Sequence, residues 1–321
     1  MLTDGHDGNS RGRLDDMKAM VLAGEVVSGL SREMTLIVRT MRPLEWIKNV
    51  FVFAPIFFSG EGEQIDKIVL VGLVFLAFSA MSSAVYIFND VRDRECDRTH
   101  PAKRERPIAS GALPVKMALA WASVLAMCSM ALVHGSPPVL AVVLAYGGMN
   151  ILYSLKLKHI VILDVFTIAI GFVLRVFAGG LIIQVEPSSW LIMATFLLSL
   201  FLGLAKRRHE LLLMKQIATA HRPVLEQYTI PLVDILTAVV TPVTLITYIL
   251  YTLDDTTMAH FHSSKLYLTA GFVVFGIFRY LYLIHRRDLG GSPTQLVIKD
   301  QPLRTAILAW VVTFAAIVYI G

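Results

Sequence analysis

The sequence predicts an all-α polytopic membrane protein, a bundle of about nine transmembrane helices. Hydrophobic residues make up 55% of its 321 residues and charged residues only 17%, which is too apolar for a soluble domain of this size. Apolar runs close to the roughly 20 residues that a membrane-spanning helix needs recur along the chain. Lipid leaves no water for unpaired backbone groups, and the alternating pattern of barrel strands is absent, so we expect these spans to be helices.

The predicted spans follow one another with turn residues between several of them. Gly111 and Pro114 precede the third span, and Gly135 precedes the fourth. Residues 1–35 are polar and lack the apolar core of a signal peptide, so we expect a disordered N-terminal arm followed by one transmembrane domain over 36–321. The nine runs are roughly 44–60, 67–88, 115–134, 137–154, 161–183, 189–205, 230–253, 265–284 and 303–320.

Lysine and arginine gather on one side of these spans. They occur in the N-terminal arm and in four polar interruptions, at 89–114, 155–160, 206–229 and 285–302. The positive-inside rule therefore places the N-terminus and the interruptions in the cytoplasm, and nine spans put the C-terminus outside. This bias, together with anionic membrane lipid, explains the net charge of +5, so we expect no nucleic-acid partner.

An acidic segment directly follows the second predicted span. Asn89, Asp93 and Asp97 are four residues apart, which places their side chains on one face of a helix, with Asp90 beside them. Carboxylate and amide oxygens suit a hard divalent cation, so the segment predicts a Mg2+ site. The simpler interpretation is a charged helix end that caps a span. The spacing, the asparagine and the basic segment that follows favour the metal site.

Basic residues near this segment are candidate ligands for a diphosphate. Lys103, Arg104 and Arg106 follow it at once and supply the cations that a diphosphate needs. Arg42 and Lys48 lie at the cytoplasmic end of the first span. Lys48 either extends to the lipid headgroups or binds a phosphate inside the bundle.

The short turn between the fourth and fifth spans also carries candidate ligands. Tyr153, Lys156 and Lys158 must lie at the cytoplasmic end of the bundle, where they either anchor the interface or bind phosphate. Arg175 lies about three turns inside the fifth span, where a lone cation is costly. It therefore either pairs with another side chain or binds an anionic substrate group.

The sixth span continues into a basic segment. Lys206 and Glu210 are four residues apart and can form an ion pair, which leaves Arg207 as a donor. The segment is either a solvated positive-inside flank or part of a phosphate site.

These motifs resemble those of the UbiA superfamily of intramembrane prenyltransferases. The resemblance rests on the signature Asn-Asp-x-x-Asp-x-x-x-Asp and on the block Asp-Arg-x-x-Pro-x-Lys-Arg-x-Arg-Pro-Ile-Ala-x-Gly, which together cover Asn89 to Gly111. It extends over nearly the whole chain after about residue 38. It implies a helical bundle around a central cavity that binds a Mg-diphosphate and opens to the cytoplasm and to lipid. The implied metal ligands are Asn89, Asp93 and Asp97, and the implied phosphate contacts are Lys48, Arg104, Tyr153 and Lys158.

The chain departs from this superfamily after the sixth span. The usual second acidic motif, Asp-x-x-x-Asp, is replaced by Lys-Arg-Arg-His-Glu from Lys206 to Glu210. Cations in place of carboxylates suggest a donor with an additional phosphate that the protein binds directly. With Arg-Pro-x-x-Trp-x-Lys-Asn at 42–49 and Asp-Gln-Pro-Leu at 300–303, the pattern resembles the branch that transfers 5-phosphoribose from phosphoribosyl diphosphate to a polyprenyl phosphate.

The resemblance implies a Mg2+-dependent reaction at the cytoplasmic face of a bacterial inner membrane, supplying precursors of the cell envelope. Asp90 and Asp93 are the expected catalytic residues, with diphosphate as the leaving group and the lipid phosphate as the attacking group. Lys206 and Arg207 would hold the 5-phosphate. The other expected substrate contacts are Arg42, Lys48, Lys103, Arg104, Tyr153, Lys156, Lys158, Arg175 and Glu210.

Two alternatives remain open at this point. The first is a prenyltransferase that acts on an aromatic or other small acceptor, with Asp164 and Glu210 forming a reduced second metal site. The second is a transporter, suggested by Arg175 and Asp234 in or near spans. The second is disfavoured because the charges gather at one face instead of lining a path through the midplane.

Overall fold

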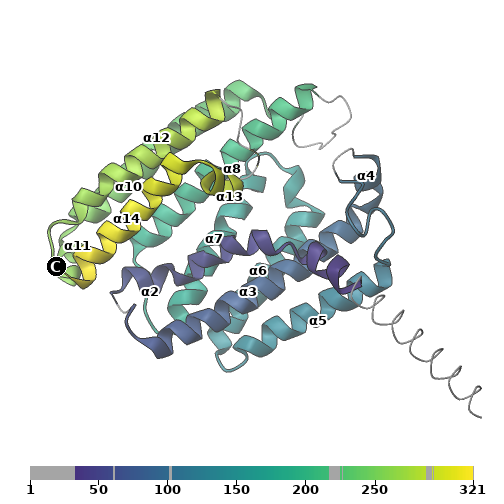
Figure 1. Ribbon diagram of the computed structural model, residues 1–321, viewed down its shortest axis with the longest axis horizontal. Helices are drawn as coiled ribbons and strands as arrows, with labels where there is room; N and C mark the ends of the chain where they lie inside the picture. The colour runs from purple at the N-terminus through teal and green to yellow at the C-terminus, as the bar shows by residue number, and fades with distance from the viewer. Residues whose placement is uncertain are drawn as a thin grey trace, which may run out of the picture.

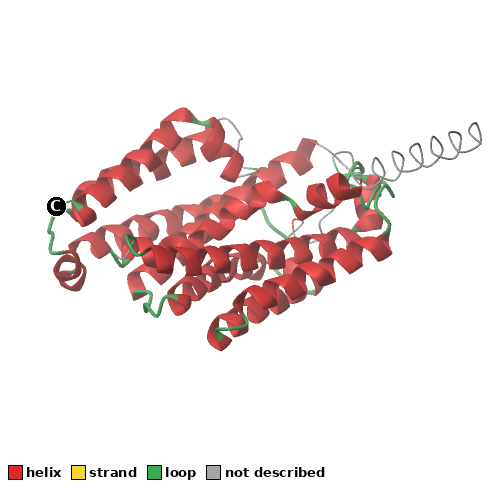
Figure 2. Ribbon diagram, turned by 60° about the horizontal axis from the view of Figure 1, so that its bottom comes forward, coloured by secondary structure: helices red, strands yellow, loops and turns green. Residues whose placement is uncertain are grey.

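The computed structural model describes residues 33–60, 62–100, 103–216, 225, 227–286, 291 and 293–320, and these form helices joined by loops (Figures 1 and 2). No strand occurs among them, so the all-α prediction is confirmed. Most of the predicted N-terminal arm, residues 1–32, lies outside the described residues. The boundary of the transmembrane domain near residue 36 therefore stays a prediction.

Eight helices in the described part of the chain are long and apolar enough to cross a membrane. Their outward faces carry large exposed apolar side chains, such as Val124 and Met127 on one helix and Val239 and Val243 on another. Such surfaces suit contact with lipid, and the chain is an integral membrane protein. The long helices are α3 (Ile65–Arg92), α5 (Val115–Val133), α6 (Pro137–Leu155), α7 (Leu163–Ile182), α8 (Ser189–Gln216), α10 (Ile230–Leu253), α12 (Ala270–Arg286) and α14 (Gln301–Tyr319).

The first predicted span, 44–60, is not a continuous α-helix. It consists of a 3-10 helix, η1 (Pro43–Phe53), followed by the short helix α2 (Ala54–Phe58). Arg42 has a left-handed backbone with φ of 56°, and the following Pro43 ends the helical residues 33–41. The residue before a proline is disfavoured in the α conformation, which explains the break.

The segment from η1 to α2 nevertheless crosses the bundle. A 3-10 helix rises about 2.0 Å per residue, so η1 and α2 together cover about 30 Å, close to the thickness of the hydrocarbon core. At one end Arg42 pairs with Asp90 of α3, and beyond the other end the Gly62 N–H donates to the Tyr319 hydroxyl of α14 over 3.2 Å. The predicted first span is thus present as a crossing segment of a different helical type.

Helix α3 packs against α5, α6, α7 and η1. Its Val71, Val74 and Phe78 are fully buried in a core that α6 completes with Val139 and Val143. In Figure 1 the long helices run roughly alongside one another, with the short helix α4 (Arg94–Thr99) at one end of the bundle and the C-terminus at the other. The remaining short elements are η2 (Leu157–His159), α11 (Asp255–Phe261), η3 (Leu266–Thr269) and α13 (Pro293–Lys299).

One contact brings helix α7 unusually close to η1. A Cβ atom added at Gly179 would lie 1.9 Å from the Val52 carbonyl oxygen, so only glycine permits this approach. The contact fixes the distance between Arg175, one turn earlier on α7, and Asn49 of η1.

The motif at 300–303 forms contacts at the start of α14. Asp300 caps α14 by accepting the Leu303 N–H over 2.9 Å, and its carboxylate also forms a two-point ion pair with Arg279 of α12. The motif therefore joins α12 to α14, and it has a structural role in the described part of the chain.

Candidate active site

The acidic segment lies where α3 ends and α4 begins. The helix axis breaks at Asp93, which follows the last residue of α3 and precedes the first of α4. Backbone hydrogen bonds of 2.8 Å from Asp93 N–H to the Asn89 carbonyl, and from Asp97 N–H to the Asp93 carbonyl, continue through the break. The four-residue spacing expected from the sequence is therefore kept at the level of the backbone.

Two of the carboxylates are buried and share one arginine. Asp90 is 4% exposed and Asp97 is 3% exposed. The Arg106 Nη1 atom donates to Asp90 over 2.9 Å and to Asp97 over 2.6 Å. Arg42, the residue before η1, contacts Asp90, and Lys103 lies 3.8 Å from Asp97. Charged donors on two sides stabilise the carboxylates in their buried position.

Asn89 and Asp93 face the turn between α6 and α7. The Lys158 Nζ atom lies 3.0 Å from Asp93 Oδ1, and the Ser154 hydroxyl donates to the Asn89 side-chain oxygen. The structure thus brings Lys158 to the acidic segment, and its predicted role in binding phosphate stays a prediction. Lys156, on the same turn, is exposed.

The side-chain oxygens here have the chemistry that Mg2+ prefers, but their arrangement is one of ion pairs. No group of three or more His, Cys, Asp or Glu side chains in the described residues is close enough to hold a metal ion. The reason is visible in the contacts, because Asp90 and Asp97 face Arg106 whereas Asp93 faces Lys158. Binding Mg2+ requires these carboxylates to exchange cationic side chains for the metal. The metal ligands Asn89, Asp93 and Asp97 stay a prediction.

Arg106 has a larger role in the structure than the sequence indicated. It appeared only as one of three cations after the acidic segment, yet it is the residue that joins Asp90 to Asp97. Arg104, which the resemblance favoured, is exposed. The spacing of Arg106 nine residues after Asp97 carries no helical signal, because a turn at 103–106 brings it back.

Arg175 is buried inside the bundle and is 4% exposed. Its Nε donates to Asn49 Oδ1 over 2.8 Å and its Nη2 to the Tyr146 hydroxyl over 2.9 Å, while the guanidinium lies 4.7 Å from the Tyr146 ring centre. Its hydrogen-bond partners within the described chain are neutral groups. Of the two interpretations left open, the structure provides the side-chain pairing, and a role in substrate binding stays a prediction.

Arg207 is enclosed by two carboxylates. It is 2% exposed, its Nε lies 2.7 Å from Asp164 Oδ2 without hydrogen-bond alignment, and its Nη1 donates to Glu210. Its Nη2 also donates to the Tyr153 hydroxyl over 3.3 Å. Asp164 and Glu210, which the prenyltransferase alternative needs for a second metal, thus both face this guanidinium.

Glu45 is a negative charge among cations at the same end of the bundle. Its carboxylate contacts Lys48 Nζ, three residues further along η1. In a 3-10 helix residues three apart lie one above the other, which favours this pair. The positive charges of Lys206 and Arg42 also act on Glu45. Lys48, a predicted phosphate ligand, is therefore paired with an acidic side chain, and Lys206, another, acts electrostatically on the same carboxylate.

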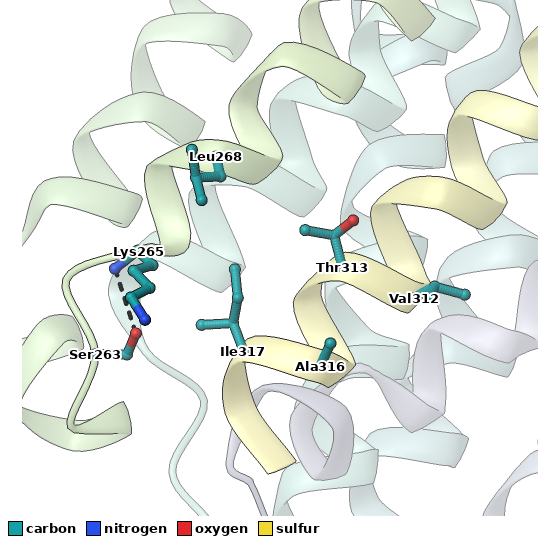
Figure 3. A pocket seen from close by; sticks show the side chains of 7 residues that line it. All are labelled: Ser263, Lys265, Leu268, Val312, Thr313, Ala316 and Ile317. Carbon is teal, nitrogen blue, oxygen red and sulfur yellow. Dashed lines mark hydrogen bonds between the residues drawn. The ribbon is translucent and has the colours of Figure 1, made fainter. Parts of the chain in front are cut away.

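A groove of about 330 Å³ lies at the other end of the molecule, between η3 and α14 (Figure 3). Leu268, Val312 and Ile317 give it apolar walls, and Lys265 lies at one side. None of the residues predicted to bind substrate or metal lines it.

The fold and the charged end together define a class of protein. An apolar helical bundle with buried carboxylates, a basic ring around them and no soluble domain in its described part suits an intramembrane enzyme that handles anionic substrates. A family model described as the UbiA prenyltransferase family matches residues 49–295, and the chain belongs to this family of transferases.

Curated relatives match the chain over most of its length. The decaprenyl-phosphate phosphoribosyltransferase of Mycolicibacterium smegmatis is 32% identical over 305 residues, which cover 92% of this chain and 93% of the relative. That of Mycobacterium tuberculosis is 33% identical, with 89% and 95% covered. Among solved structures, a UbiA homolog from Archaeoglobus fulgidus bound to GPP and Mg2+ has a TM-score of 0.66 at 18% identity, covering 88% of this chain and 99% of that one. This structural likeness shows the fold.

Proposed function

We propose that the protein transfers 5-phosphoribose from phosphoribosyl diphosphate to a polyprenyl phosphate and releases diphosphate. The observation that carries the proposal is the extent of the similarity to two decaprenyl-phosphate phosphoribosyltransferases, which covers about nine-tenths of the chain and of each relative. The enclosed Arg207 supports it, because a guanidinium stands between the two carboxylates that a second metal would use.

The reaction breaks the bond between C1 of the ribose and the diphosphate oxygen, and forms a bond from C1 to an oxygen of the lipid phosphate. A Mg2+ ion held by Asn89, Asp93 and Asp97 would neutralise the charge that develops on the leaving diphosphate. Lys158 would contact the same diphosphate, and its distance of 3.0 Å from Asp93 supports this role. The lipid phosphate is already anionic at neutral pH, so the step needs no strong general base.

Asp90 would support the proposed diphosphate site by fixing the positions of two arginine side chains. Its carboxylate accepts hydrogen bonds from Arg42 and Arg106, which come from different segments of the chain. Lys48 and Lys206 are the proposed contacts of the 5-phosphate. Arg207, expected in this role from the sequence, is enclosed by Asp164 and Glu210, so we do not propose it as a contact of that phosphate. Exposed apolar side chains on the long helices provide a path for the polyprenyl tail within the membrane.

We place the acidic end of the bundle in the cytoplasm of a bacterial cell and the C-terminus outside. The polar segments that carry lysine and arginine, including 89–114 and 206–229, lie at this end of the sequence-predicted spans. The crossing segment of η1 and α2 makes the number of membrane crossings odd, which supports opposite sides for the two ends of the chain.

The experiment that tests this function supplies two labelled donors to membranes that contain the protein. Radiolabelled phosphoribosyl diphosphate with polyprenyl phosphate is expected to give a labelled lipid, and a labelled prenyl diphosphate with an aromatic acceptor is expected to give none. The reverse result would establish the prenyltransferase alternative.

Replacing Asp93 tests the metal assignment. Asp93→Ala removes a proposed ligand of the metal, and we expect transfer to fall about 100-fold or more. Glu95→Ala is a matched control, because Glu95 is an exposed acid of the same segment that pairs with Arg98. Turnover of the Asp93 variant close to that of the wild type would contradict the assignment.

A further inference from the structure

The turn between α6 and α7 contains a strained residue. Ile162 has φ of 71° and ψ of −46°, a backbone conformation that is rare for a β-branched side chain. Its side chain is 41% exposed, so tight packing around it does not impose this conformation. Strained residues persist only where neighbouring groups hold them, and they occur often at functional sites. Contacts of the backbone, and not packing of the Ile162 side chain, must therefore hold this turn in its conformation.

The group that holds it is the hydroxyl of Tyr228. The Ile162 N–H donates to the Tyr228 oxygen over 2.7 Å, although the two residues are 66 positions apart in the sequence. Tyr228 lies just before α10, is 3% exposed, and donates its own proton to Asp164 Oδ1 over 2.8 Å. Burial, with the bond to Asp164, raises the pKa of Tyr228, so the phenol keeps its proton and remains a donor.

Asp164 carries the connection on to helix α8. It is completely buried, and its second carboxylate oxygen faces Arg207, which in turn donates to Tyr153 on α6. The chain of contacts from Ile162 to Tyr153 therefore links both ends of the turn to α8. A single phenol hydroxyl, accepting one hydrogen bond and donating another, stands at its centre.

The turn that is held in this way carries Lys158. Only three residues, Leu157–His159, form its short 3-10 helix, and Lys158 extends from it to Asp93 at 3.0 Å. A change in the backbone at Ile162 would move this lysine relative to the acidic segment. Tyr228 and Ile162 themselves are not among the proposed substrate contacts.

We propose that Tyr228 is a positioning residue, which fixes the turn between α6 and α7 so that Lys158 meets the diphosphate of the donor beside Asp93. The identity of that donor rests on the proposed function. The positioning itself requires only that the ligand carries a diphosphate. Tyr228 acts through Ile162 and Asp164 and does not contact the reacting atoms.

Tyr228→Phe in the full-length purified protein tests the proposal, because it keeps the ring and removes the hydroxyl. We expect the KM for phosphoribosyl diphosphate to rise about 10-fold, with the KM for polyprenyl phosphate unchanged and the thermal midpoint close to that of the wild type. Tyr280→Phe is the matched control, since Tyr280 is equally buried, at 3% exposed, and its hydroxyl has no hydrogen-bond partner in the described structure.

A second substitution separates positioning from a general effect on folding. Glycine adopts positive φ without strain, so Ile162→Gly added to Tyr228→Phe is expected to recover part of the lost donor affinity. Donor KM unchanged in Tyr228→Phe, or equal losses for donor, acceptor and thermal midpoint without recovery by Ile162→Gly, would overturn the proposal.

Binding of inorganic diphosphate with Mg2+ is measured on the same proteins by calorimetry. We expect it to weaken about 10-fold in Tyr228→Phe and to stay at the wild-type level in Tyr280→Phe. If the wild type fails to use phosphoribosyl diphosphate, the proposed function falls, but this binding series still decides the role of Tyr228. Equal diphosphate affinity in the wild type and Tyr228→Phe would refute it.

Discussion

The charged residues at the acidic end of the bundle form two kinds of ion pair, one buried and one more exposed. Asp90 and Asp97 are buried against Arg106, whereas Asp93 and Lys158 are more exposed and form a pair that the proposed metal-bound diphosphate would separate. The sequence spacing pointed to the carboxylates but not to their partners. Tyr228 was not among the predicted site residues, and neither the pairing of Arg106 with Asp90 and Asp97 nor that of Asp164 with Arg207 was predicted, since contacts between distant segments leave no periodic signal in one sequence.

Arg106→Gln tests whether this arginine neutralises the buried carboxylates. Removing one partner of a buried ion pair typically costs about 3–5 kcal/mol, and because Arg106 is 29% exposed we expect about 1–3 kcal/mol of stability to be lost. A divalent cation can replace the lost charge, so the loss is expected to be smaller in Mg2+ than in EDTA. Thermal unfolding in detergent measures the stability of the variant and the wild type in Mg2+ and in EDTA. A variant as stable as the wild type in EDTA would contradict this role.

Glu45→Gln tests whether the carboxylate competes with substrate for its cations. Glu45 contacts Lys48 and lies in the field of Lys206 and Arg42, so a phosphate bound by these cations would compete with it. Loss of its charge is expected to lower the donor KM about 2- to 5-fold. Glu63→Gln, an exposed acid beyond α2, serves as the control. A higher donor KM in Glu45→Gln would mean that Glu45 organises the cations.

At the scale of elements, the positions of the long helices were predicted from the sequence, but the helix type of the first span and the break at Asp93 were not. Hydrophobic runs of about 20 residues are a strong signal, and eight of them match helices of the described chain. The 3-10 helix η1 was not predicted, because its residues are as apolar as those of a membrane-spanning α-helix. Only Pro43 at its start and Pro55 in the following α2 hint at a difference. The break at Asp93 between α3 and α4 was likewise outside what spacing reveals.

Because α7 packs closely on η1 at Gly179, we expect a larger side chain at this position to destabilise the protein. Gly179→Ala would place a methyl group against the Val52 backbone, and we expect about 1–3 kcal/mol of destabilisation from the forced separation. Gly148→Ala on α6 is the matched control, since an added Cβ there meets nothing within 4 Å and alanine favours a helix. Chemical unfolding in detergent compares the two. Equal stability of both variants would show that α7 can shift freely.

At the scale of the whole molecule, the sidedness of the membrane is open to a direct test. Cys96 is exposed beside the acidic segment, and Ser263 lies at the groove of the opposite end. In a Cys128→Ala background, a membrane-impermeant thiol reagent is expected to label Cys96 in inverted vesicles and to leave it unlabelled in intact cells. Ser263→Cys, in a chain lacking both native cysteines, should show the reverse pattern. The opposite result for either site would reject the proposed orientation.

The proposed reaction requires that the ribosyl group, and not the diphosphate, reaches the lipid. The most direct measurement uses two batches of phosphoribosyl diphosphate, one labelled in the ribose and one in the terminal phosphate of the diphosphate, with polyprenyl phosphate and Mg2+. We expect the ribose label to enter the lipid fraction and the diphosphate label to stay in water. A lipid that acquires the diphosphate label, or neither label, would contradict it.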